Sequence, residues 1–338
     1  MRAASNINPN NLRMKRLLLF LIVCTLIPLT LRSQQSMTVM FMNTENLFDP
    51  EDDPLKDDDD YTPGGEYHWT KSRYWDKLDA VSKVIVAADE DQAPALVGLC
   101  EVENETVLKD LTSRSALREA GYRFVMTDSP DRRGIDVALM YRRTFFRLIG
   151  QESLRVNLRH YGGGATRDIL HVTGVLDNHD TIDVYVCHWP SRYGGVEQSE
   201  PLRISAARRL RASADSIIKV RRKPYIIIMG DLNEGPDDPA VRDVLTAGGR
   251  LVTVMDRLDG GSYKYDGEWD KYDQFIVSDS FTNSLGCTEL LGAEIMDLPF
   301  LLTDDDNYGG QRPLRTYNGR RYLGGYSDHL PIKMRVGF

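Results

Sequence analysis

The sequence is poor in cysteine and has no apolar run long enough to cross a membrane as a helix. Its four cysteines, Cys24, Cys100, Cys187 and Cys287, are too widely spaced for a disulfide framework or a zinc motif. The longest apolar run, residues 17–31, has fifteen residues against the ~20 that a spanning helix needs. The sequence also lacks internal repeats. These absences exclude a disulfide scaffold and a repeat protein, and they predict free, buried thiols.

The N-terminal segment has the charge order of a signal peptide. Lys15 and Arg16 precede the apolar run, and Pro28 interrupts it. We therefore expect a signal peptide over residues 1–33, with translation starting at Met1 or at Met14, and one catalytic domain over 34–338. Export to the periplasm or the extracellular space follows from this expectation. An uncleaved membrane anchor is the alternative.

The charge of the chain is strongly acidic. The formal charge is -8, and the first 33 residues carry five basic residues and no acid, which leaves -13 for the rest. Such a field repels polyphosphates, so a nucleic-acid substrate needs a local basic cleft or bound cations. Residues 51–65 carry seven acids in their first ten positions, together with Pro and Gly. This segment predicts a solvated loop; a calcium site is the alternative, although the spacing fails the EF-hand pattern.

Hydrophobic periodicity predicts many strands with helices between them. Helices are expected over 73–88 and 201–220, the second with Arg203, Arg208, Arg209 and Arg211 on a solvated face. Strands are expected over 37–42, 96–99, 137–141, 169–175, 182–186, 225–229, 274–277 and 332–336. The 41% hydrophobic content suffices for a large core. A single α/β or α+β domain follows.

Polar residues recur where these strands end. They are Asn43 and Glu45, Glu101, His188, Asp231 and Asn233, Asp273, and then Asp328 and His329. Carboxylate and amide oxygens suit Mg²⁺, Mn²⁺ or Ca²⁺ rather than zinc. Two histidines beside acids are typical of in-line displacement at phosphorus, where one group takes a proton and another protects the leaving oxygen.

Three segments resemble the signature blocks of the endonuclease/exonuclease/phosphatase superfamily. They are Gly98–Val102 (GLCEV), Met229–Asn233 (MGDLN) and Tyr326–Pro331 (YSDHLP). Their order and their separation along the chain make the resemblance specific, and it covers Met37 to the C-terminus. It implies a deoxyribonuclease-I-like, four-layer α/β (α+β) sandwich, with two packed mixed sheets flanked by helices.

The resemblance also implies roles for the polar residues. Asp231 and Asn233 match the pair that positions or activates the attacking water, and His329, oriented by Asp273, matches the histidine that contacts phosphate. Asn233 would also contact the phosphate. The expected metal ligands are Asn43, Glu45, Glu101 and Asp328, with Mg²⁺ as the first candidate ion and Mn²⁺ or Ca²⁺ as alternatives.

Two further motifs refine the resemblance. His188 resembles the second histidine of pancreatic-type deoxyribonucleases and would act as a general acid, with Asp136 as the candidate acid that orients it. Arg167 matches the arginine that holds the scissile phosphate, a task that suits a bidentate guanidinium. The preceding Gly162–Gly164 triplet predicts a hairpin rather than a phosphate cradle, because no helix follows it. His68–Trp69 and Arg315–Tyr317 either border the cleft or pack at loop bases.

The expected function is metal-dependent phosphodiester hydrolysis by a monomer with no protein partner. Nucleic acid, DNA or RNA, is the first candidate substrate. A phospholipid of the sphingomyelin type or a small phosphoester such as an inositol phosphate is the alternative, because the same core residues serve those reactions on this fold. A binding protein that has kept the fold without catalysis is a third hypothesis.

Overall fold

The computed structural model describes residues 35–283 and 288–338. The signal peptide expected over 1–33, the alternative start at Met14, and Cys24 and Cys287 lie outside these residues. The described chain forms one unit, Ser36–Phe338. No helix in the described ranges is both long and apolar enough to cross a membrane.

The first large sheet has six strands in the order β13-β18-β1-β2-β4-β3. Only β1 and β2 run parallel to each other; the remaining pairs are antiparallel. The bounds are β1 Ser36–Leu47, β2 Leu96–Val102, β3 Tyr122–Met126, β4 Asp136–Arg142, β13 Glu289–Ile295 and β18 Ile332–Gly337.

The second large sheet also has six strands, in the order β5-β6-β7-β8-β12-β9. Here only β7 and β8 are parallel. The bounds are β5 Phe146–Leu154, β6 Ile169–Leu176, β7 Thr181–His188, β8 Tyr225–Asp231, β9 Leu251–Thr253 and β12 Asp273–Ser278.

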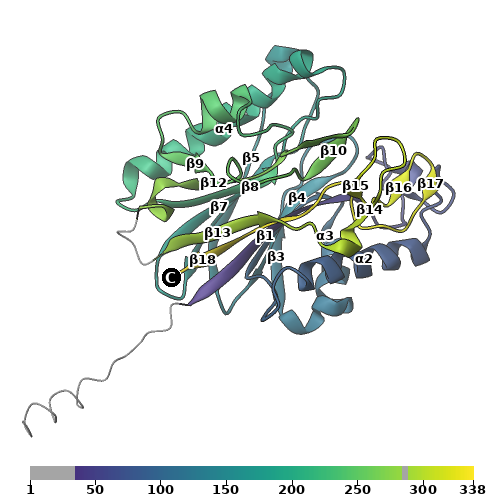
Figure 1. Ribbon diagram of the computed structural model, residues 1–338, viewed down its shortest axis with the longest axis horizontal. Helices are drawn as coiled ribbons and strands as arrows, with labels where there is room; N and C mark the ends of the chain where they lie inside the picture. The colour runs from purple at the N-terminus through teal and green to yellow at the C-terminus, as the bar shows by residue number, and fades with distance from the viewer. Residues whose placement is uncertain (1–34, 284–287) are drawn as a thin grey trace, which may run out of the picture. The chain divides into compact units, whose positions relative to one another are not determined.

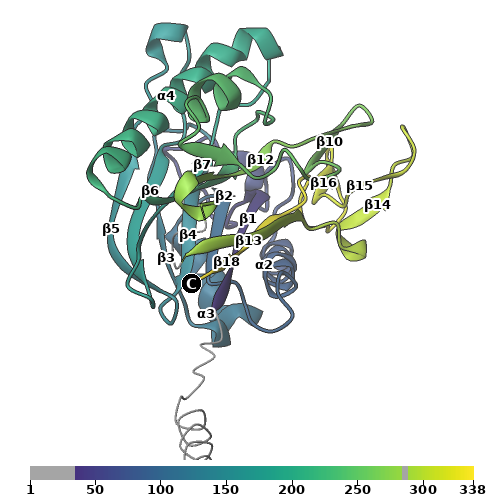
Figure 2. The same ribbon diagram turned by 60° about the vertical axis from the view of Figure 1, so that its left-hand side comes forward.

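The two sheets pack face to face between helices (Figures 1 and 2). Side chains such as Phe41, Val184 and Met229 fill the core between the sheets. Helices α2 (Lys71–Val86) and α3 (Glu105–Arg114) cover the outer face of the first sheet. Helix α4 (Val196–Val220) and the π-helical turn η4 (Ala240–Leu245) cover the second. Because both faces are covered, central strands read as continuous apolar runs, and every residue of β8 is buried.

Short hairpins and 3-10 turns complete the unit. The hairpins are β10 (Tyr263–Tyr265) with β11 (Glu268–Asp270), β14 (Leu302–Asp304) with β15 (Gln311–Pro313), and β16 (Tyr317–Asn318) with β17 (Arg321–Tyr322). The turns are η1 (Asp59–Tyr61), η2 (Ala116–Ala120), η3 (Arg159–Tyr161), η5 (Asp279–Phe281) and η6 (Pro299–Leu301).

These elements confirm the fold that the resemblance predicts and change some details. Helix α4 begins at Val196 rather than at Pro201, so Pro201 lies inside the helix, where it lacks a backbone donor. Arg203 was expected on a solvated face, and this prediction is wrong: its side chain is fully buried and paired with buried Glu234. Cys100 and Cys187 are buried free thiols, as expected.

Candidate active site

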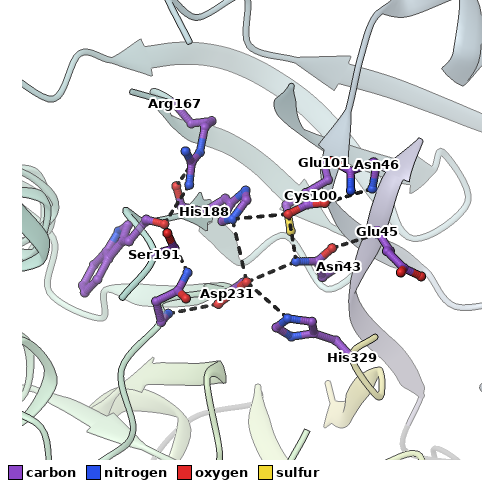
Figure 3. A network of polar contacts seen from close by, with 12 residues as sticks. Asn43, Glu45, Asn46, Cys100, Glu101, Arg167, His188, Ser191, Asp231 and His329 are labelled. Carbon is purple, nitrogen blue, oxygen red and sulfur yellow. Dashed lines mark hydrogen bonds and ion pairs between the residues drawn. The ribbon is translucent and has the colours of Figure 1, made fainter. Parts of the chain in front are cut away.

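One cavity of about 530 Å³ collects most of the residues predicted for the site. It lies where β1, β2, β7 and β8 end, so two strands from each sheet contribute (Figure 3). The predicted residues that line it are Asn43, Glu101, His188, Asp231, Asn233, Asp328 and His329. We call this the catalytic cavity.

Backbone irregularities aim these side chains into the cavity. The pairing of β1 with β2 shifts register between Asn43 and Leu47, and the pairing of β2 with β4 shifts between Cys100 and Val102. Glu101 and Asn233 adopt left-handed backbone conformations, with φ of 61° and 49°. Such conformations cost about 1–3 kcal/mol each for residues other than glycine and persist only where the surroundings impose them. At Asn233 the backbone amide donates to Asp231 Oδ1 at 3.0 Å, which helps to hold the turn.

Asp231 lies at the centre of the polar network. Asn43 Nδ2 donates to Asp231 Oδ2 at 3.1 Å, and the same oxygen lies 3.7 Å from His329 Nε2 and 3.8 Å from His188 Nε2 (Figure 3). Burial raises the pKa of Asp231 to about 7, while His329 opposes this rise and Asp273 adds to it. This carboxylate is therefore placed and tuned for proton transfer.

His329 and Asp273 form a buried hydrogen-bonded pair. His329 Nδ1 and Asp273 Oδ2 are 2.7 Å apart, which leaves Nε2 facing Asp231. Burial alone would lower the pKa of His329, but the carboxylates of Asp273 and Asp231 outweigh burial and raise it well above its ordinary value. Ligand atoms of these three residues lie within 4.8 Å of one another, close enough to suggest a metal site. Asp273 holds Nδ1 of the ring and Asp231 faces its Nε2, a geometry that fits a hydrogen-bonded relay.

Glu101 offers an available carboxylate oxygen for a cation. Its Oε2 accepts the Asn46 backbone amide at 2.9 Å, whereas its Oε1 lies 3.5 Å from Asn43 Nδ2 and 3.7 Å from His188 Nε2. An oxygen without a short hydrogen bond, beside an amide side chain, fits a hard divalent ion. Glu101 therefore fits a divalent ion, whereas Asn43 turns its Nδ2 toward Glu101 and Asp231 and its Oδ1 accepts the Glu45 backbone amide at 2.9 Å.

The other two expected metal ligands, Glu45 and Asp328, share an arginine. Arg315 Nε lies 3.3 Å from Glu45 Oε1, and Arg315 NH2 lies 3.0 Å from Asp328 Oδ2. Glu45 also accepts the backbone amide of Thr316 at 2.5 Å. Burial and the nearby Asp328 raise the pKa of Glu45, an effect that Lys77 and Arg315 reduce. Asp328 lines the catalytic cavity, while Glu45 lies behind it, engaged with Arg315.

His188 faces the cavity without the acid that was expected to orient it. Asp136 instead accepts from Thr127 Oγ1 at 2.5 Å and from the Ser129 amide, so it stabilises the turn before β4. His188 Nδ1 has no hydrogen-bond partner among the described residues. Burial, followed by Arg167 and Arg133, lowers the pKa of His188 well below its ordinary value. Its Nε2 lies 3.7 Å from Glu101 Oε1 and 3.8 Å from Asp231 Oδ2, and the role of general acid stays a prediction.

The structure places Arg167 outside the catalytic cavity. Its guanidinium donates to the backbone oxygens of His188 and Trp189, at 3.3 and 2.8 Å, and to Asp131 at 3.1 Å. It lines a neighbouring cavity instead. The expectation that Arg167 grips the scissile phosphate is not met in this arrangement, because the side chain is buried and supports the segment after β7.

Two arginines that the sequence reasoning did not assign line the catalytic cavity. Arg133 is 49% exposed and its nearest acid, Asp131, is 3.7 Å away. Arg192 donates to the Asn233 carbonyl at 2.8 Å and lies over the ring of Tyr272. Arg133 stands directly before Gly134, whose φ of 74° turns the chain. The Arg133–Gly134 pair, two residues before Asp136, is the sequence signal for this turn.

Aromatic side chains border the same cavity. Tyr263 packs against His329, with ring centroids 4.7 Å apart, while Tyr193 and Tyr265 are largely exposed at the opening. Trp69 is fully buried and donates to the Phe48 carbonyl, and Tyr317 is buried beside it. Of the two alternatives for the segments containing Trp69 and Tyr317, packing is therefore correct for these two side chains.

The two-sheet sandwich, with an Asn–Glu pair and an Asp–His relay at the strand ends, defines a phosphoester hydrolase. Residues 38–337 match the sequence profile of the Endonuclease/Exonuclease/phosphatase family, and the chain belongs to that family. It is a metal-dependent hydrolase of phosphate esters, as the enzymes of this family are. No curated protein matches the chain.

Solved structures share the fold at low sequence identity. An endonuclease/exonuclease/phosphatase family protein from Bacteroides thetaiotaomicron is 16% identical with a TM-score of 0.58, over 90% of this chain and 98% of that one. A mannosyl-6-phosphatase from the same organism is also 16% identical, with a TM-score of 0.58 over 89% and 100%. TDP2 from D. rerio, complexed with single-strand DNA product, is 14% identical with a TM-score of 0.55 over 90% and 100%.

Proposed function

We propose that the chain is an exported phosphodiesterase that hydrolyses nucleic acid. The observation that carries the proposal is the convergence of Asn43, Glu101, Asp231 and His329 in one cavity that two cationic side chains, Arg133 and Arg192, also line. Anionic catalytic groups and arginines together suit a phosphate that must be bound and attacked at the same place.

The residues divide the chemistry between them. Asp231 and Asn233 position the attacking water, with Asp231 as the base, and His329 donates to a phosphoryl oxygen while Asp273 holds its ring. His188, at the end of β7 in the second sheet, hydrogen-bonds the phosphate. Glu101 would hold a divalent cation, with Mg²⁺ as the first candidate, which when bound offsets charge on the phosphate and the leaving oxygen. Asn43 donates to Asp231 and holds that carboxylate in place.

Several features favour nucleic acid as the substrate. Tyr193 and Tyr265 are 93% and 63% exposed at the opening, and exposed rings there can stack bases. The fold is shared with TDP2 bound to a single-strand DNA product. The acidic charge of the chain opposes polyanion binding. Arg192 is paired with Asp238 and Arg133 lies 3.7 Å from Asp131, so a bound cation would supply part of the offset beside these two arginines.

A small phosphoester is the second candidate substrate, and one observation favours it. The fold matches the full length of a mannosyl-6-phosphatase. A phosphorylated sugar or another small phosphoester would need no extended cationic surface, which is consistent with the net charge of -8.

Export rests on the N-terminal charge order and apolar run. The periplasm or the extracellular space is the proposed location. The intact mass of protein recovered from a periplasmic or culture fraction tests it: loss of about the first 33 residues supports export with cleavage, whereas a full-length membrane-bound chain supports an anchor.

The activity test compares substrates in parallel with the purified protein. Plasmid DNA, RNA, sphingomyelin, a sugar phosphate and bis(p-nitrophenyl) phosphate are incubated with Mg²⁺, Mn²⁺, Ca²⁺ or EDTA. Nicked plasmid or degraded RNA is the expected result. Hydrolysis of the lipid or the sugar phosphate alone would sink the nuclease assignment while keeping the site.

Variants of Asp231 and His329 test the site itself. Asp231→Ala or His329→Ala should abolish hydrolysis of every substrate, while circular dichroism and thermal melting stay close to wild type. Full activity in either variant would contradict the site assignment, and a chain inactive with every metal and substrate would favour a binding protein.

A further inference from the structure

A second cavity adjoins the catalytic cavity and has the opposite electrostatic character to most of the chain. It has a volume of about 480 Å³ and shares Arg133, Ser191 and Tyr193 with the catalytic cavity. Its other lining residues include Arg167, Thr166 and Gly164. Three residues line both spaces, so the two cavities are neighbours, and we call the second space the side cavity.

The side cavity contains two arginines and no carboxylate among its lining residues. The catalytic cavity and three other cavities of similar size are each lined by three or more acidic residues, and the most acidic of them includes Asp49, Asp53 and Glu103. In a chain of net charge -8, a cavity whose charged lining residues are both arginines is a local exception. Its charge suits an anion.

An unpartnered hydroxyl also points to a ligand there. Thr166 is 4% exposed, and its Oγ1 has no hydrogen-bond partner within the described part of the chain. A buried hydroxyl without a partner is unfavourable, so such groups usually meet water or a ligand. Thr166 is also a lining residue of the side cavity, so its hydroxyl is a candidate donor to a ligand bound there.

Arg167 lines the side cavity with a side chain that is held by hydrogen bonds. Three protein acceptors already hold its guanidinium, so its position is fixed; one of them is the Asp131 carboxylate, which offsets part of its charge. Arg133 has no acid closer than 3.7 Å and belongs to both cavities. An anion in the side cavity would thus be bound by one fixed cation and one that also reaches the scissile phosphate.

We propose that the side cavity binds the phosphate next to the scissile one in a nucleic-acid strand. This inference rests on the proposed nuclease function and extends it, because it gives the enzyme a preference for substrates with two neighbouring phosphates over isolated diesters. Arg133 lies between the two phosphates, and Thr166 donates to the outer one. Tyr193, at the shared opening, stacks on the base between them.

Gly164 allows a clean perturbation of the side cavity. A Cβ placed on this residue would meet no atom within 4 Å, and its φ is outside the left-handed range, so a side chain fits without strain. Gly164→Glu puts a negative charge into the side cavity, and Gly164→Gln is a neutral control of equal size. Gly164 does not line the catalytic cavity.

The test measures inhibition of bis(p-nitrophenyl) phosphate hydrolysis by three phosphorothioate-linked dithymidines: TpT, pTpT and TpTp. In the wild type and in Gly164→Gln, one of the two phosphorylated forms should inhibit with a Ki lower than that of TpT by about tenfold, the effect of one charge-assisted contact in a partly solvated site. Gly164→Glu should abolish this preference and leave the hydrolysis rate without inhibitor unchanged. Thr166→Val should weaken the preference.

Equal Ki values for all three dithymidines in the wild type would overturn the proposal, as would a preference that survives in Gly164→Glu. A loss of basal hydrolysis in Gly164→Glu but not in Gly164→Gln would also overturn it, since the charge would then be acting on the catalytic cavity. Plasmid nicking is scored separately and reports the nuclease function, so the two failures are distinguishable.

Discussion

Removing Arg203 should destabilise the fold and disturb the site from a distance. Arg203, on α4, ion-pairs with Glu234 while both side chains are fully or almost fully buried. It also donates to Ser199 Oγ at 2.7 Å and to the Val196 carbonyl at 3.2 Å. Arg203→Met keeps most of the side-chain volume and leaves the Glu234 carboxylate buried beside Asn233, without its ion-pair partner.

The expected magnitude follows from the burial of the pair. Breaking a buried ion pair by removing one partner costs about 3–5 kcal/mol. Unfolding entropy near the melting temperature is about 2.1 cal/mol/K per residue, so for the roughly 300 residues of Ser36–Phe338 the melting temperature should fall by roughly 5–8 °C. Removing both charges in Arg203→Met/Glu234→Gln should restore much of the loss, because no unpaired charge remains.

The loss of folding stability in Arg203→Met should depend on pH in one direction. Burial raises the pKa of Glu234, and Arg203 is among the groups that oppose this rise. In Arg203→Met the folded-state pKa should rise further above that of the unfolded chain. The ionised carboxylate then destabilises the fold by its full penalty above the folded-state pKa; the penalty decreases as the pH falls below that value and vanishes below the unfolded-state pKa. The deficit should therefore be smaller at pH 5 than at pH 8.

Thermal and urea unfolding of four proteins tests this reasoning: wild type, Arg203→Met, Arg203→Met/Glu234→Gln and Lys109→Met. Lys109 forms an exposed pair with Glu105 on α3, for which a change of at most ~1 kcal/mol is expected. If Arg203→Met costs no more than Lys109→Met, or if the double variant is no more stable than the single one, the argument from the buried pair is wrong.

Three further predictions concern catalysis. Asp273→Asn should lower kcat by about 10²–10⁴-fold while KM changes little, because His329 loses its charged partner; steady-state kinetics check this, and an unchanged kcat would remove Asp273 from the relay. Glu101→Gln should raise the Mg²⁺ concentration needed for half-maximal rate, measured by metal titration after EDTA treatment; an unchanged requirement would place the ion elsewhere. Asp136→Asn should retain catalytic turnover, since Asp136 bonds the Thr127–Ser129 turn; a loss as large as that in Asp273→Asn would restore it as the partner of His188.

The framework of the site could be predicted from the sequence because it follows strand periodicity. Asn43, Glu101, His188 and Asp231 close apolar runs, and strands that end together at a pair of packed sheets bring such residues into one place. The match of each short block to a family pattern added their roles. This part of the site depends on local order along the chain, which a single sequence contains.

The arginines could not be assigned in the same way, because loops decide where they point. Arg167 follows a glycine-rich turn and reaches back to the carbonyls of residues 188 and 189, whereas Arg133 enters the catalytic cavity from a turn closed at Gly134. Arg203 looked like one of several exposed arginines on a helix, yet a single long-range partner, Glu234, draws it into the core. Such pairings depend on tertiary contacts between distant segments, and periodicity carries no information about them.

The placement of the catalytic residues on interior strands also governs how the enzyme loses activity. β1, β2, β7 and β8 each have a hydrogen-bonded neighbour on both sides within their sheets. Backbone amides in such positions exchange with solvent mainly through global opening, unlike those of surface loops. Inactivation by denaturant should therefore coincide with loss of the whole fold.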